Sequence, residues 1–168
     1  MIYGGMLMNK EQIMNYIETH TISEYDFSRV LGEFVNDRDV VMAVIRKNSS
    51  NYKILSEAFR NDPEILQTAL KSVGMFSRNP MDYALPGALT KENILLAIDK
   101  DALSDYRIRE NFSQYLADKE LMMYFIQTKG IDLYRYLPEE LRSDPEVLNA
   151  VLQRKRGGGA WNNPMDHA

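Results

Sequence analysis

The chain has 168 residues, of which 20 are Lys or Arg, 24 are Asp or Glu, two are His and none is Cys. It therefore has no disulfide, no thiolate metal site and no cysteine nucleophile, and two histidines cannot build a multi-histidine metal site within one chain. A hydrophobic share of 45% is that of a globular protein, and a net charge of −4 gives no general reason to expect a phosphate backbone as the partner.

The first segment, MIYGGMLMNK, has neither the charged start nor the sustained apolar core of a signal peptide. Because a ribosome-binding sequence can encode Gly4–Gly5, we expect the natural start to be Met8 rather than Met1, in a bacterial or viral gene. No apolar run approaches the roughly 20 residues of a membrane span. We therefore expect no membrane association and a cytoplasmic location, in a bacterium or in an infected host cell.

Helix-start signals recur through the rest of the chain. Residues 9–20 predict a helix that caps one end of the fold, and residues 23–34 predict a short helix. Five further starts, spaced by 25 to 29 residues, are each followed by apolar residues at helical spacing, and no strand pair is visible. The predicted starts are Asp37, Asp62, Lys91, Asp118 and Asp144.

Two of these units align without a gap. Tyr52–Val73 and Tyr134–Lys155 are identical at 9 of 22 positions and share an Asp-Pro-Glu sequence before the longer helix. The Asp can cap free main-chain N–H groups, Pro suits the first turn, and Glu is favourable near the positive end of the helix dipole. A capping box formed by Ser143 and Glu146 is an alternative start for the second copy.

The regular spacing predicts an all-α fold of tandem helix pairs. Each unit of about 26 residues would hold one short and one longer helix, and the units would stack into a short, curved, solenoid-like array. We expect a single domain over residues 1–156, consisting of the capping helix and five helix pairs. Residues 157–168 would follow it as a flexible, glycine-rich tail.

The repeated frame resembles a known but uncharacterised family. It reads D-x-[DE]-[VI]-[VL]-x-A-[VL], followed about ten residues later by L-x-x-x-[FL]-x-x-D, and is similar to a domain of unknown function found in tandem in bacterial and giant-virus proteins. The resemblance covers about residues 36–156 and implies helix pairs and repetition, but no catalytic residues. Two units depart from the frame, with Lys91 in place of Asp and Tyr124 in place of Ala. The matching segments are Asp37–Val44, Leu55–Leu66 and Leu137–Val151.

A second motif recurs outside that frame. The sequence Asn-Pro-Met-Asp at Asn79–Asp82 returns at Asn163–Asp166, after three glycines and Trp161. One interpretation is a duplicated turn in which Asn caps a short helix that begins with Pro. The other is a tail that docks, with the tryptophan as its anchor. The candidate partner-binding residues are therefore Trp161, Asn163, Pro164, Met165, Asp166, Tyr83 and Tyr136, and the tyrosines that could line one face of the array are Tyr25, Tyr83, Tyr106 and Tyr136.

The charged residues have architectural explanations. Carboxylate pairs such as Asp62 with Glu64 recur in register with helix starts, which favours capping over acid–base catalysis. The basic cluster Arg154–Lys155–Arg156 either complements a helix dipole or, with Lys47 and Lys71, binds nucleic acid.

The sequence thus predicts a binding protein rather than an enzyme, with no cofactor, no metal and no catalytic residue. We expect a non-enzymatic protein-binding module, such as a small accessory protein of a phage or mobile element that binds and inhibits a host protein. The alternative is a nucleic-acid-associated helical-repeat protein that uses Arg154–Arg156. A hydrolase with a carboxylate pair is a third class, and it would require two facing carboxylates in an apolar cleft.

Overall fold

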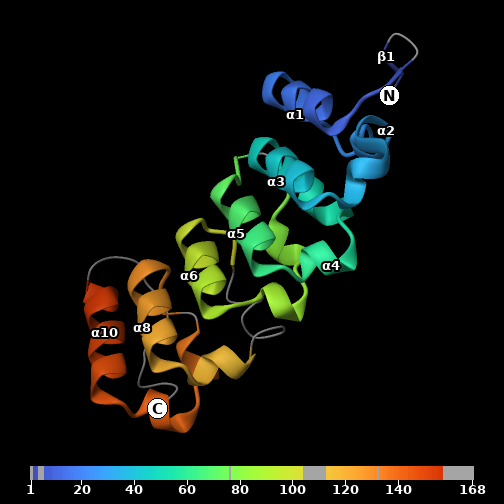
Figure 1. The fold of residues 1–168 in the computed structure, drawn as a ribbon. Helices are drawn as coiled ribbons and strands as arrows, with labels where there is room; N and C mark the ends of the chain where they lie inside the picture. The colour runs from blue at the N-terminus through green and yellow to red at the C-terminus, as the bar shows by residue number, and fades with distance from the viewer. Residues whose placement is uncertain (1, 4–5, 76, 104–112, 132, 157–168) are drawn as a thin grey trace. The chain divides into compact units, whose positions relative to one another are not determined.

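The structure is a computed structural model that describes residues 2–3, 6–75, 77–103, 113–131 and 133–156. These residues are helical apart from turns, loops and one very short strand pair, so the predicted all-α class is confirmed (Figure 1). The chain divides into two compact units, residues 1–102 and residues 103–168. The single domain over residues 1–156 stays a prediction.

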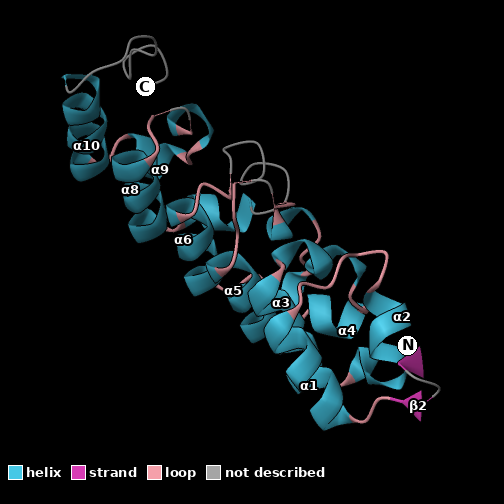
Figure 2. Ribbon diagram, turned by 90° about the horizontal axis from the view of Figure 1, so that it is seen from above, coloured by secondary structure: helices cyan, strands magenta, loops and turns pink. Residues whose placement is uncertain are grey.

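The strand pair corrects the expectation that the chain has none. Strand β1 (Ile2–Tyr3) pairs antiparallel with β2 (Met6–Leu7), with Ile2 opposite Leu7 (Figure 2). Strands of two residues are too short to show an alternating pattern in the sequence.

Four helices of the first unit lie side by side in chain order: α1 (Lys10–Thr19), α3 (Arg38–Lys47), α5 (Pro63–Lys71) and α6 (Lys91–Asp99) (Figures 1 and 2). Each packs against the next through apolar side chains that are completely buried, among them Val40, Ile65 and Ile94. The connecting segments form short α-helices and 3-10 helices, which are α2 (Phe27–Leu31), η1 (Gly32–Asn36), η2 (Ser49–Ile54), α4 (Glu57–Arg60), η3 (Pro80–Asp82) and η4 (Pro86–Ala88).

The second unit contains the same kinds of element. Its longer helices are α8 (Lys119–Thr128) and α10 (Pro145–Arg156), which pack against each other. The shorter elements are η5 (Ser113–Ala117), η6 (Tyr134–Tyr136) and α9 (Glu139–Arg142).

Side-chain caps begin the longer helices where the sequence predicts them. The carboxylate of Asp62 accepts the N–H groups of Glu64 and Ile65 at 2.9 and 3.1 Å, and Asp144 accepts those of Glu146 and Val147. Asp37 caps α3 through the N–H groups of Asp39 and Val40, and Asp118 caps α8 through that of Leu121 alone.

Helix α6 begins at Lys91, the predicted start, and the hydroxyl of the preceding Thr90 caps it in place of an Asp carboxylate. Two predicted details are wrong. The Ser143 hydroxyl donates to the carbonyl of Glu139, which leaves Asp144 as the cap of α10 and excludes the Ser143 capping box. The predicted helix over residues 23–34 is instead α2 followed by η1, because Gly32 at a φ of +54° interrupts it.

Candidate interaction surface

Several predicted site residues lie outside the residues that the structure describes. These are Tyr106 and the tail residues Trp161, Asn163, Pro164, Met165 and Asp166. Lys155 and Arg156 belong to the last turn of α10.

The first Asn-Pro-Met-Asp copy is a capped turn built into the core of the first unit. The Asn79 side chain accepts the N–H of Met81 at 3.0 Å, and Pro80 is the first residue of η3. Pro80 and Met81 are both buried. This copy therefore has the predicted Asn cap and Pro start, although the element is a single 3-10 turn rather than a short α-helix.

Two of the basic residues that could bind nucleic acid, Arg154 and Lys47, are in contact with the ends of neighbouring helices. The Arg154 guanidinium donates to the carbonyl of Thr128 at the end of α8, at 3.3 Å, and Lys47 donates to the carbonyl of Glu18 near the end of α1, at 2.8 Å. Carbonyls in the last turn of a helix lack partners within the helix, and cations are favourable there. These contacts support the helix-dipole interpretation of Arg154, and they give Lys47, which was named only as a nucleic-acid-binding candidate, the same kind of contact.

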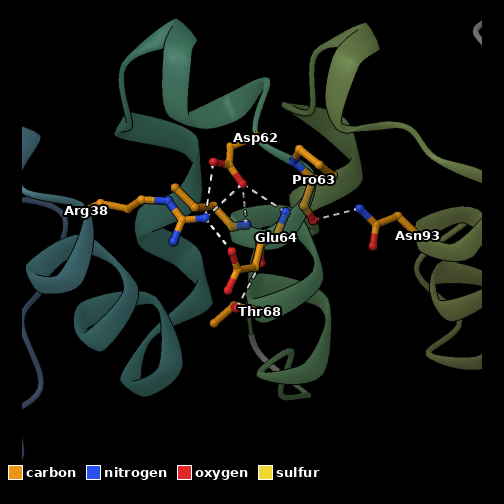
Figure 3. Close-up of polar contacts among 7 residues, drawn as sticks. Arg38, Asp62, Pro63, Glu64, Thr68 and Asn93 are labelled. Carbon is orange, nitrogen blue, oxygen red and sulfur yellow. Dashed lines mark hydrogen bonds and ion pairs between the residues drawn. The ribbon is translucent and has the colours of Figure 1, made fainter.

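At the other end of the helices, cations join the caps of neighbouring helices. Arg38, the first residue of α3, contacts both Asp62 at 3.3 Å and Glu64 at 2.6 Å in the first turn of α5 (Figure 3). The same Asp62 carboxylate accepts two main-chain N–H groups of its own helix. Capping and ion pairing thus account for the position of this acidic pair at a helix start.

The same arrangement occurs twice more. Lys10, the first residue of α1, contacts Asp37 and Asp39 of the α3 start, both at 2.9 Å. Lys119, the first residue of α8, contacts Asp144 at 2.8 Å and Glu146 at 2.6 Å at the α10 start. A hydrogen bond from the lysine holds the pKa of Asp37, and likewise that of Asp144, below its usual value.

One acidic residue joins three loops at an edge of the first unit. Glu24 accepts from the Arg78 guanidinium at 2.9 Å and from the Lys53 ammonium at 3.3 Å, and the Arg78 main chain donates to the Ser50 hydroxyl. Burial raises the pKa of Glu24, but the hydrogen bonds from Arg78 and Lys53 outweigh it and leave the pKa below its usual value. The loops before α2, around η2 and after α5 are therefore fixed to one another.

Two large side chains close in sequence to members of this cluster are almost completely exposed. Tyr25, which follows Glu24, is 96% exposed, and Met75, three residues before Arg78, is 92% exposed. Exposed apolar groups beside fixed polar groups are typical of interaction sites. We call this the Glu24 surface, and define it as Glu24, Tyr25, Lys53, Ile54, Met75 and Arg78.

The predicted tyrosines differ in their surroundings. Tyr83 is half-buried and adjoins Arg78, whose pKa is raised first by Glu24 and also by Tyr83, so it borders the Glu24 surface. In the second unit, the Arg135 guanidinium lies 4.9 Å from the centre of the half-buried Tyr136 ring, a cation–π contact. Met75 was missed in the sequence, because an isolated methionine in a loop has no distinguishing pattern.

The described part of the chain was also compared with the features of a metal site, a membrane span and a ligand cavity. It contains no group of three acidic or histidine side chains placed to hold a metal, and none of its helices is long and apolar enough to cross a membrane. A cavity of about 130 Å³ beside α1 is lined mainly by apolar side chains, and Glu33 is its one acidic contact.

Residues 37–83 match the model of a family described as a domain of unknown function (DUF4116). No curated protein and no solved structure shows a significant match to the chain. The family match runs from the Asp37 cap to Tyr83 and so includes part of the Glu24 surface. Over the rest of residues 36–156, the resemblance stays a prediction.

Proposed function

We propose that the chain is a non-enzymatic protein-binding module made of tandem helix-pair repeats. The observation that carries the binding role is the exposure of Tyr25 and Met75, which are close in sequence to the ion-paired residues Glu24 and Arg78. Tyrosine and methionine are enriched at protein interfaces, and a surface whose loops are already fixed loses little conformational entropy on binding.

Recurrent contacts support the tandem-repeat architecture. Lys10, Arg38 and Lys119 each begin one helix and pair with the acidic cap of the next long helix. Cations near the last turns of α3 and α10 contact the ends of α1 and α8. In such arrays each unit contacts chiefly its neighbours, and the stacked units present an extended surface to partners.

The test compares protein capture by variants of the full-length chain. A chain carrying both Tyr25→Ala and Met75→Ala should lose the captured partner that the wild-type chain retains. Gln153→Ala, which also shortens an exposed side chain but in α10, is the matched control and should retain it. All three chains should unfold at nearly the same temperature, since exposed side chains contribute little to stability. Equal capture by the double variant and the control would exclude the Glu24 surface as the site.

Nucleic acid is the competing class of partner. The cluster Arg154–Arg156 would have to bind it, but Arg154 is already in contact with the end of α8. A protein partner is therefore the better-supported proposal. A gel shift at low salt that weakens steeply as salt rises, and that is reduced by Arg154→Ala, would reverse this preference.

A further inference from the structure

The inference concerns the outer face of α10, which differs from the corresponding face of α5. The alignment that pairs Asp62 with Asp144 also pairs Leu66 with Leu148 and Leu70 with Leu152. In α5 both leucines are completely buried, whereas in α10 Leu148 is half-buried and Leu152 is 44% exposed.

The opposite faces of the two helices are alike. Ile65 and its counterpart Val147 are completely buried, as are Ala69 and its counterpart Val151. The difference is therefore confined to one side of α10 and does not reflect a general loosening of the helix.

Neighbouring elements explain the burial of the α5 leucines. Helices α6, η3 and η4 all pack against α5, and η3 is the turn formed by the first Asn-Pro-Met-Asp copy. Its Met81 is only 3% exposed. A methionine from this motif is thus part of the apolar layer next to α5.

The same four residues follow α10 at a similar distance along the chain. Met81 comes 11 residues after Leu70, and Met165 comes 13 residues after Leu152. The nine residues from Arg156 to Met165 can span about 30 Å, while Leu152 lies only about 6 Å from Arg156 along the helix. The chain can therefore reach back to the exposed leucines.

We propose that residues 163–168 dock on the outer face of α10, with Met165 against Leu148 and Leu152. The occupant is this segment of the chain itself, because it carries the sequence whose first copy contacts the equivalent helix. This contact is independent of the Glu24 surface, and it assigns Met165 and Asn163 to an internal contact rather than to a partner.

The absence of cysteine from the chain allows a direct test by thiol reactivity. Leu152→Cys and Gln153→Cys each place one thiol in α10 of the full-length protein. Gln153 is exposed, and its side chain is turned by about 100° from that of Leu152. Each variant is made with Met165 and with Met165→Lys, and the rate of alkylation by a maleimide is measured.

We expect Met165→Lys to raise the reactivity of the thiol at position 152 several-fold and to leave that at position 153 unchanged. Equal rates at position 152 in the two backgrounds would overturn the proposal. Protection that disappears on dilution would also overturn it, because a second copy of the chain would then be the occupant.

A disulfide experiment tests the same contact by proximity. Under mild oxidation, the pair Leu152→Cys with Met165→Cys should close within one chain several-fold faster than the pair Gln153→Cys with Met165→Cys. Equal closure rates would indicate an undocked tether, and predominantly dimeric products would indicate a second copy; either result contradicts the proposal.

Discussion

The hydroxyl of Tyr52 donates a hydrogen bond to the main-chain carbonyl of Arg60, 2.8 Å away, from a ring that is completely buried. Tyr134 makes the same bond to the carbonyl of Arg142 at 2.7 Å. Burial raises the pKa of both hydroxyls, which keeps them protonated as donors. Each tyrosine thereby ties the 3-10 helix that contains it to the end of the short helix before an Asp cap.

These bonds should contribute measurably to stability. We expect Tyr52→Phe and Tyr134→Phe each to lower the free energy of unfolding by about 1 kcal/mol, the usual net value of a buried hydrogen bond. The Arg60 carbonyl also accepts the N–H of Leu85, so it keeps one partner in the Tyr52 variant. Urea denaturation measures the effect. Tyr25→Phe is the control, and a Tyr52→Phe chain as stable as this control would contradict the prediction.

A close approach at Gly87 predicts a steric effect. A Cβ atom there would lie 2.6 to 2.8 Å from side-chain atoms of Asn61, whose oxygen also accepts the Gly87 N–H at 2.7 Å. Gly87→Ala should cost about 1–3 kcal/mol, because the Asn61 side chain must move and the bond is lost. Gly74→Ala is the matched control, since its nearest contact would be an ordinary 3.5 Å. In an Asn61→Ala background, Gly87→Ala should cost much less; an unchanged cost would locate the clash elsewhere.

The hydrogen bonds of Asn93 predict how a buried charge at this position would change the stability of the first unit. Its side-chain NH₂ donates to the carbonyls of Pro63 at 2.8 Å and Ala88 at 2.9 Å (Figure 3 shows the contact with Pro63). Asn93→Asp replaces this donor by a buried carboxylate facing carbonyl oxygens and should cost at least about 2 kcal/mol at neutral pH. The deficit relative to the wild type should narrow in acid, where a protonated Asp can donate. Asn15→Asp, at an exposed position of α1, should change stability by less than about 0.5 kcal/mol.

Local signals in the sequence predicted the helix caps. The ion pairs between helices and the Glu24 surface depend instead on contacts between segments that are distant in the sequence. An Asp followed two residues later by an acidic residue and then by apolar residues at helical spacing identifies Asp37 or Asp144 without tertiary information. The start of α6 at Lys91 was also predicted, but its cap Thr90 was not, because the repeated frame has an acidic residue at the cap and a hydroxyl serves there as well.

The Glu24 surface could not be predicted from such signals. Glu24 and Arg78 are 54 residues apart, and their bond depends on how two loops pack rather than on any periodic pattern. The choice of Arg38 as the partner of Asp62 likewise depends on the stacking of α3 on α5. Ion pairs that join neighbouring helices are visible in the sequence only after the register of those helices is known.

The ion pair between Lys10 and Asp37 predicts a specific dependence on pH. A hydrogen bond from Lys10 lowers the pKa of Asp37 in the folded chain, so this pair stabilises the fold above the unfolded-state Asp pKa of about 3.9. The stabilisation is lost as the pH falls through the lower, folded-state pKa. Lys10→Met should therefore unfold at a lower temperature than the wild type near pH 7, and the difference should shrink in acid. High salt should reduce it as well, because the pair is exposed to solvent.

Thermal unfolding followed by circular dichroism between about pH 2 and pH 7 tests this dependence across the unfolded-state pKa. Lys71→Met is the control, because Lys71 donates to the Gln67 amide oxygen at 2.8 Å, and an amide does not titrate. Its difference from the wild type should stay constant across the range. If the Lys10 and Lys71 variants followed parallel curves, the ion pair would contribute nothing to the acid sensitivity of the fold, and the junction of α1 with α3 would depend on apolar packing instead.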